Sequence, residues 1–203
     1  MPADLRAKDE ELPEATPGKR VMRADSQRSL DALLQAAKRV FARSGVEAPV
    51  REIAAEAGVG VATLYRHFPQ RSDLVIAIFR RELESCADAA EEYARTLPPW
   101  EALRKWMQRF VDFVSAKHGL AAALHSGDPA YEPLRDHFDL RLKPAMHRLL
   151  DSAVKSGDVR ADVDAGELLS AIFSLCHPAS DAKGWATARR MVDLLTDGLR
   201  VTR

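Results

Sequence analysis

Apolar residues in the first third of the chain recur at three- and four-residue steps, the spacing that places side chains on one face of an α-helix. The spacing predicts a first helix that ends at Ser44-Gly45 and whose apolar face carries Leu30, Leu33, Leu34, Ala37 and Phe41. Two short helices are predicted at residues 50–57 and 61–68, separated by a glycine-containing turn at 58–60. A long helix then begins near residue 71 and ends before the two prolines at 98–99.

Helical spacing continues through the rest of the chain. It predicts apolar stripes within residues 103–114, 134–150 and 165–176, and a last helix at 184–199. Turn-forming residues separate these segments at 126–129, 156–158 and 177–184. Because no convincing run of alternating apolar and polar residues occurs, we expect an all-α fold with about nine helices.

The distribution of prolines and apolar residues divides the chain into three parts. Residues 1–22 contain three prolines and few large apolar side chains, which predicts a flexible tail. Residues 23–70 hold the first three predicted helices and form an N-terminal domain. Residues 71–203 hold the remaining helices and form a larger C-terminal domain.

Composition excludes several classes of protein. The chain of 203 residues is 46% hydrophobic, enough to bury a core, but its densest apolar run, at residues 75–79, is far too short to span a bilayer. The N-terminal segment lacks the apolar stretch and the cleavage site of a signal peptide. We therefore expect a cytoplasmic protein with no membrane partner.

Residues that could carry out catalysis or bind a metal do not occur in a recognised pattern. Neither Cys86 nor Cys176 belongs to a zinc-binding motif, and both are interpreted as buried, reduced thiols. No nucleophile elbow, HExxH motif, P-loop or complete dinucleotide fingerprint is present. The expectation is a protein that is not an enzyme and that has no metal and no cofactor.

Charge is distributed unevenly although the formal net charge is zero. Residues 19–80 contain eleven lysines and arginines against six acidic residues, so the excess of positive charge lies around the two short helices. A basic N-terminal domain on a more acidic body is typical of DNA-binding proteins, although unrelated surfaces can carry a similar excess.

The segment from Val50 to Phe68 has the features of a helix-turn-helix. Such a motif needs small residues where its helices touch, a glycine in the turn, and apolar residues that fix the angle between the helices. Either Ala54 or Ala55 fits the first requirement and Gly58 the second, and the apolar set is Ile53, Ala57, Val59, Leu64 and Phe68. The alternative interpretation is an ordinary corner between two helices, since most such corners bind nothing.

If Leu64 and Phe68 face inward, the rest of the second short helix faces outward and can enter a DNA groove. Arg51 and Arg66 are long enough to contact base edges, and Val61 or Ala62 could meet a thymine methyl group. Four further residues can donate hydrogen bonds to phosphates: Thr63, Tyr65, His67 and Arg71. Gly60 can cap the second helix, without the side-chain oxygen of serine or threonine.

The stretch from Ser29 to Leu83 resembles the N-terminal domain of TetR-family repressors. The resemblance rests on Val50-Arg51-Glu52-Ile53-Ala54, on Ala57-Gly58-Val59, on Thr63-Leu64-Tyr65-Arg66-His67-Phe68, and on Arg71-Ser72-Asp73-Leu74. It implies that Arg51 contacts bases, that residues 61–63 face the groove, and that Tyr65, His67 and Arg71 hold phosphates. The chain departs from the family at Pro49 and Gly60, where serine or threonine is common, and at Arg71, where the family has lysine.

The resemblance also implies the function of the C-terminal domain. It would bind a small-molecule effector, and its last two helices would pair with those of a second copy in a homodimer. The chain is thus expected to be a sequence-specific DNA-binding regulator, a repressor that a small molecule releases from its double-stranded operator. The alternative is a protein-interaction adaptor of the same fold that has lost operator binding, because Pro49 and Gly60 lack the expected phosphate contacts.

Aromatic and histidine side chains between residues 100 and 176 are candidates for the wall of an effector pocket. Such pockets combine apolar walls with a few polar groups, although the same residues also build ordinary helical cores. They predict an apolar or aromatic effector, and the candidate residues are Trp106, Phe110, Phe113, His125, Tyr131, Phe138, His147 and Phe173.

Overall fold

The computed structural model describes residues 17–118, 120–124 and 126–201, with the backbone alone for residues 17–24, 118, 121, 122 and 135. Within these residues the chain forms nine α-helices and one short 3-10 helix, with no strand beyond an isolated bridge between Val159 and Arg200. The predicted all-α fold is confirmed. The elements are α1 (Pro17–Ser44), α2 (Val50–Ala57), α3 (Val61–His67), α4 (Arg71–Thr96), α5 (Pro99–His118), α6 (Ala121–Leu124), η1 (Pro129–Tyr131), α7 (Pro133–Lys155), α8 (Ala165–Cys176) and α9 (Ala182–Asp197).

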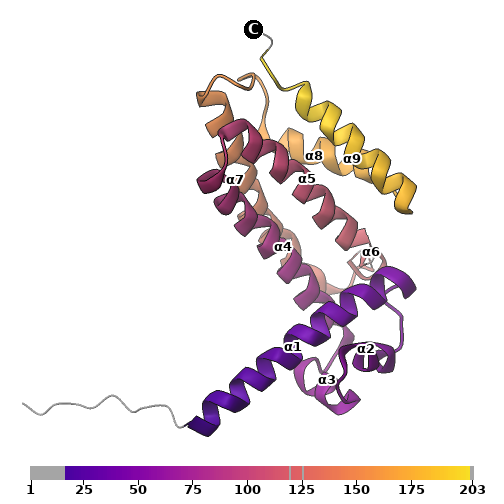
Figure 1. Ribbon diagram of the computed structural model, residues 1–203. Coiled ribbons are helices and arrows are strands. Elements are labelled where there is room, and N and C mark those ends of the chain that lie inside the picture. The colour runs from indigo at the N-terminus through magenta and orange to yellow at the C-terminus, as the bar shows by residue number, and fades with distance from the viewer. Residues whose placement is uncertain (1–16, 119, 125, 202–203) are drawn as a thin grey trace, which may run out of the picture.

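Helices α1, α2 and α3 form a head at one end of the molecule, and α5, α7, α8 and α9 form a body at the other (Figure 1). The head has its own buried residues from all three helices, among them Leu33, Phe41, Ile53 and Leu64. These are the positions at which the sequence predicts an inward face, because helical periodicity gathers apolar side chains on one side.

The first helix is longer than the sequence predicts. It begins at Pro17, so residues 17–22 are helical and do not belong to a tail. Proline is well tolerated in the first turn of a helix because the amide it lacks has no partner there. The rest of the predicted tail, residues 1–16, lies outside the described residues, and its flexibility stays a prediction.

Helix α4 runs from the head into the body (Figure 1). At 26 residues it is about 39 Å long at 1.5 Å per residue. Its start is fixed by a capping box, in which the Gln70 amide donates to the Asp73 carboxylate over 2.9 Å. Two ion pairs join α4 to α1, Arg81 with Asp31 at 2.6 Å and Lys38 with Glu82 at 2.8 Å. Movement within the body can therefore reach the head through one continuous helix.

The body is built around aromatic side chains of α5. Trp106, Phe110 and Phe113 are fully buried, and the Trp106 indole donates to the Cys86 carbonyl of α4 over 2.8 Å. Stacked ring pairs, with centroids 5.5 and 5.8 Å apart, join Phe110 to its two neighbours on α5. This stack fixes α5 between α4 and the C-terminal helices.

Both cysteines are buried and free, as the sequence predicts. Burial raises the pKa of the Cys86 thiol to about 12 and that of Cys176 to about 11. A thiol with a raised pKa is a poor nucleophile at neutral pH, so these residues fill space in the core. Among the described helices, none is both long and apolar enough to cross a membrane.

Helices α8 and α9 lie side by side on one side of the body (Figure 1). Each begins with an aspartate that accepts hydrogen bonds from backbone amides of its first turn, Asp164 for α8 and Asp181 for α9. The predicted bounds of α8 agree with the structure, while α9 begins and ends two residues before the predicted range. On α9, the large apolar side chain of Leu194 is 63% exposed.

Candidate nucleic-acid interface and effector pocket

The turn between α2 and α3 depends on Gly58. This residue has φ +68° and ψ +28°, the left-handed conformation that glycine adopts without steric cost. Its amide donates to the Ala55 carbonyl over 3.1 Å, and the next amide, of Val59, donates to the Ala54 carbonyl over 3.0 Å. Helix α2 thereby ends at the turn, after which Gly60 is extended and α3 begins.

Packing between the two helices follows the sequence prediction. Ile53 and Ala54 of α2 are buried, as are Leu64 of α3 and Phe68, which caps its C-terminus. Because Leu64 and Phe68 are four residues apart, they bury the same side of α3. The opposite side of α3 is therefore left to solvent.

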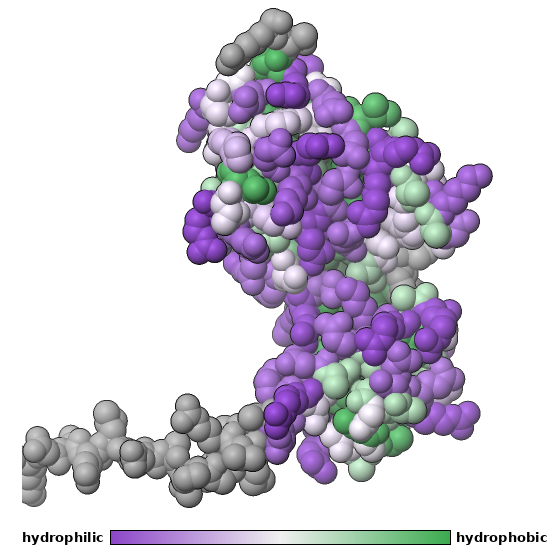
Figure 2. Space-filling model, viewed as in Figure 1, coloured by the Kyte–Doolittle hydropathy of each residue, from purple (hydrophilic) through white to green (hydrophobic). Residues whose placement is uncertain are grey.

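The outward face of α3 carries the predicted groove-contacting residues. Val61 is 38% exposed and Tyr65 is 50% exposed, and Ala62 and Arg66 are exposed beside them. Thr63 and His67, at the margins of the helix, are half-buried. In Figure 2, hydrophobic and hydrophilic residues are adjacent on the surface at the end of the head where α2 and α3 lie.

Arg51 and Arg66 have free guanidinium groups within the part of the chain that the structure describes. Both are exposed, and neither forms a hydrogen bond or ion pair with another described residue. Gly60, also exposed, precedes α3 without a side-chain cap. Two uncompensated arginines on one motif can bind a polyanion or a base edge.

Other basic residues of the head are already paired. Glu56 of α2 accepts from Arg39 of α1 over 2.8 Å and from Arg43 over 3.5 Å. The hydrogen bond from Arg39 is the main cause that lowers the pKa of Glu56, and Arg43 adds to it. This cluster attaches α2 to α1. The positive charges of Arg39 and Arg43 are therefore used to hold the head together.

Arg71 occupies a position that differs from the expected one. Its side chain is half-buried, and Nη1 donates to the carbonyl oxygens of Val46 and Ala48, in the second case over 3.0 Å. Both carbonyls belong to the loop between α1 and α2. In this geometry the guanidinium is directed into the protein. The phosphate contact that the resemblance implies for Arg71 stays a prediction.

A pocket of about 750 Å³ opens between α4, α5, α7 and α8. Among the predicted effector-binding residues, Tyr131, Phe138 and Phe173 line it. The sequence prediction missed the other lining residues, whose apolar members include Phe79 and Leu124 and whose charged members are Lys117, Asp128, Glu132 and Asp136. Phe79 belongs to the inward stripe of α4, so its periodicity indicated burial but could not indicate a pocket.

The other predicted effector residues lie elsewhere. Trp106, Phe110 and Phe113 are fully buried behind the pocket, where the Phe110 ring lies 5.2 Å from Phe173 and 6.2 Å from Phe138 between centroids. They therefore support the wall without lining it. His147 does not line this pocket: its side chain is 64% exposed on α7 and pairs with Asp151 at 3.1 Å, and its role in effector binding stays a prediction. His125 lies outside the described residues.

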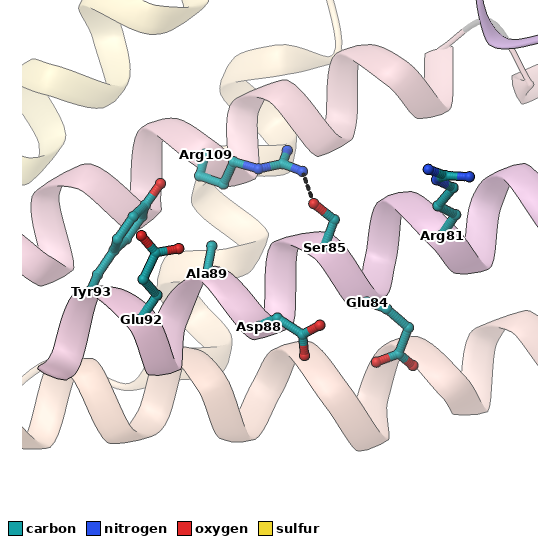
Figure 3. Close-up of a pocket in the computed structure, with 8 residues that line it drawn as sticks. All are labelled: Arg81, Glu84, Ser85, Asp88, Ala89, Glu92, Tyr93 and Arg109. Carbon is teal, nitrogen blue, oxygen red and sulfur yellow. Dashed lines mark hydrogen bonds between the residues drawn. The ribbon is translucent and has the colours of Figure 1, made fainter. Parts of the chain in front are cut away.

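A second hollow, of about 580 Å³, follows the surface of α4. Figure 3 shows Arg109 reaching from α5 toward Ser85 of α4, a hydrogen bond of 3.0 Å, while Glu84 points to the opposite side. Glu84 accepts from His137 over 2.7 Å and from Arg141 over 2.8 Å, both on α7. Because most charged groups here are paired with neighbouring helices, this groove joins helices together and is a weaker candidate for a ligand site.

No group of three or more histidine, cysteine, aspartate or glutamate side chains suited to a metal ion occurs among the described residues. The polar groups of the pocket can form hydrogen bonds or ion pairs with an organic molecule.

Comparison with known proteins relates both halves of the chain to bacterial regulators. Residues 33–78 match the family model described as bacterial regulatory proteins, tetR family, and residues 98–201 match that of the transcriptional regulator SbtR-like C-terminal domain. A TetR transcriptional regulator from Streptomyces coelicolor is 38% identical, with TM-score 0.74, over 85% of this chain and 99% of that chain. A TetR transcription regulatory protein from Mycobacterium vanbaalenii is 32% identical, with TM-score 0.72, over 89% and 99%.

A further match covers a smaller part of the chain. An HTH-type transcriptional regulator from Staphylococcus aureus (strain USA300) is 38% identical over 64 residues, which is 31% of this chain and 35% of that protein. The chain thus spans about a third of that regulator's length.

Proposed function

Because this chain belongs to the TetR family of bacterial regulatory proteins, we propose that it is a dimeric repressor released from operator DNA by an apolar or aromatic effector. The observation that carries the proposal is the outward face of the helix-turn-helix, where Arg51 and Arg66 are exposed and unpaired among the described residues. A surface of this kind suits a groove lined with phosphates and base edges.

DNA recognition is divided among few residues. Arg51, at the start of α2, and Arg66 of α3 would contact base edges, and Val61 and Ala62 would approach thymine methyl groups. The half-buried Thr63 and His67 and the exposed Tyr65 would donate to phosphates at the edge of the groove. Sequence specificity would therefore depend mainly on the two arginines.

The assembly would be a homodimer through α8 and α9. The exposed Leu194 supports this, together with the half-buried Leu175, Trp185, Met191 and Leu195 on the same pair of helices. In a homodimer, the same helices of a second copy would cover the part of these apolar side chains that is left exposed. A dimer with two-fold symmetry would set two recognition helices about 34 Å apart, one turn of DNA, and would require an inverted-repeat operator.

Selection of binding sites from a library of random DNA duplexes tests the DNA-binding proposal. We expect an inverted repeat to be enriched, and Arg51→Ala to weaken binding to it by about 1–3 kcal/mol, because a bidentate base contact is lost. Binding to unrelated duplexes should change far less. Gel shifts with both kinds of duplex measure the two affinities.

Arg95→Ala is the matched control, since Arg95 is an exposed arginine in the last turn of α4, in the part of the helix farthest from the head. It should leave both affinities unchanged. Equal losses on selected and unrelated DNA in Arg51→Ala would contradict the base-contacting role. If no sequence were enriched, the adaptor without operator binding would be the better interpretation.

The effector would occupy the pocket between α4, α5, α7 and α8. Its volume, about 750 Å³, lies within the usual range for small-molecule sites, and Phe79, Phe138 and Phe173 provide an aromatic wall. Filling it would press on Phe79 of α4, the helix that continues into the head. That contact offers a route from the ligand to the DNA-binding motif.

Titration with a panel of hydrophobic drugs and acyl compounds tests the effector proposal. A compound that binds the folded protein at 100 times its Kd should stabilise it by about 2.7 kcal/mol and release DNA at the same concentrations. Phe138→Ala should weaken binding, whereas His147→Ala, on the exposed side of α7, should not. Thermal unfolding and calorimetric titration provide the readouts, and equal effects of the two variants would contradict the assignment.

A further inference from the structure

Arg71 joins the start of α4 to the loop that leads into α2. Its Nη1 donates to the carbonyls of Val46 and Ala48, which lie more than twenty residues earlier in the sequence. A cationic donor shared between two carbonyls forms stronger hydrogen bonds than a neutral one. The beginning of α4 and the entrance to the helix-turn-helix are therefore held by one side chain.

The loop that Arg71 holds has few other restraints. The amide of Ala48 donates to the Gly45 carbonyl over 3.2 Å, and the side chains of Val46 and Ala48 are buried. Helix α2 begins after Pro49 with no side-chain cap. Arg51 lies in the first turn of that helix, so its orientation depends on how firmly the loop is positioned.

The rim of the effector pocket packs against the helix that begins with Arg71. Tyr131, in η1, lines the pocket, and η1 packs against α4. Burial is the main cause that raises the pKa of the Tyr131 phenol; the charges of Asp128 and Glu47 raise it further, and Arg71 lowers it. Tyr131 thus lies within electrostatic reach of both the α1–α2 loop and Arg71.

We propose that Arg71 is a positioning residue that connects the Tyr131 rim of the pocket to the entrance of the DNA-binding motif, and that it makes no phosphate contact. The proposal rests on DNA binding by the head as proposed above. A shift of η1 when the pocket fills would change how Arg71 holds the two carbonyls. The loop and the first turn of α2 would then tilt, and Arg51 would lose its place in the groove.

The two roles of Arg71 differ in their dependence on salt. A phosphate contact releases about one counterion, so its removal lowers the slope of log K against log salt by about one. A positioning residue leaves that slope unchanged and lowers the preference for the selected site over unrelated DNA. A lysine would replace a phosphate-binding arginine, but its side chain is one bond shorter, so its nitrogen would not reach the position from which Nη1 donates to both carbonyls.

The experiment compares Arg71→Gln, Arg71→Lys and Tyr131→Ala with the unaltered chain and with Arg66→Gln as a control. Operator affinity is measured on the selected duplex and on a duplex of unrelated sequence, each over a range of salt concentrations. Amide hydrogen exchange is measured without DNA, so it reports on residues 45–52 even if no operator is found. Arg66 is an exposed arginine of the same motif with no described partner.

For Arg71→Gln we expect faster exchange at residues 45–52, a loss of about tenfold in the ratio of selected to unrelated affinity, and an unchanged salt slope. Arg71→Lys should not restore that ratio, and Tyr131→Ala should speed exchange in the same segment. Arg66→Gln should leave exchange there unchanged.

A salt slope lowered by about one in Arg71→Gln, with full recovery in Arg71→Lys, would overturn the proposal in favour of a phosphate contact. Exchange in Tyr131→Ala that changes only near residues 128–134 would overturn the connection to the pocket. If the unaltered chain bound no DNA selectively, the proposed function would fail, while the exchange data would still decide whether Arg71 and Tyr131 hold the loop.

Discussion

Phe110→Ala is expected to lower the free energy of unfolding by about 3–5 kcal/mol, the largest effect among the substitutions considered. Phe110 is fully buried, and its ring packs at centroid distances of 5.5 Å on Trp106 and 5.2 Å on Phe173. Truncation would remove the transfer free energy of the ring and leave a cavity that a rigid aromatic wall cannot fill. Urea denaturation followed by circular dichroism measures the change.

The control for Phe110→Ala is Leu140→Ala on α7. Leu140 is 71% exposed, so its truncation should change the free energy of unfolding by no more than about 0.5 kcal/mol. Phe110→Leu should fall between the two, because most of the apolar volume is kept. A loss in Phe110→Ala no larger than that of Leu140→Ala would mean that the aromatic stack is not the centre of the core.

Leu64→Ala is expected to destabilise the chain by about 2–5 kcal/mol and to abolish selective DNA binding. Leu64 is buried on the inner side of α3, with Phe68 one turn further on. Without it, α3 would lose the contact that sets its angle to α2, although every outward side chain would remain. Urea denaturation and gel shifts on the selected duplex give the two measurements.

Tyr65→Ala separates packing from recognition in the same helix. Tyr65 is adjacent to Leu64 but 50% exposed, so its removal should leave the free energy of unfolding nearly unchanged and weaken DNA binding. Both substitutions should thus weaken DNA binding, but only Leu64→Ala should lower the free energy of unfolding. Unaltered DNA binding in Leu64→Ala would show that α3 keeps its position without this contact.

Local pattern predicted most of the helices because helical spacing and turn residues act within a few positions. The bounds of α2 and α8 agree with the prediction, and α1 ends at Ser44. The left-handed Gly58 was expected from its place between two helical patterns. The start of α1 at Pro17 was missed, since a proline-containing polar segment resembles a tail as closely as a first turn.

The same local pattern could not separate a core from a pocket. Phe113 and Phe138 belong to equally strong apolar stripes, yet the first is fully buried and the second lines the cavity. His147 lies within an apolar stripe in sequence but faces solvent on α7. Periodicity identifies the face of a helix, whereas the neighbours of that face come from segments far away in the chain.

The helix-turn-helix was determined by the sequence itself: its turn, its packing residues and its outward arginines all follow from positions within one short segment. The tertiary structure alone decided where the long side chains of distant segments meet. It directs Arg71 to carbonyls of the α1–α2 loop and packs η1, which contains Tyr131, against α4. The physical reason is that a local pattern records which residues avoid water, while a hydrogen bond between distant residues forms only after the helices have packed.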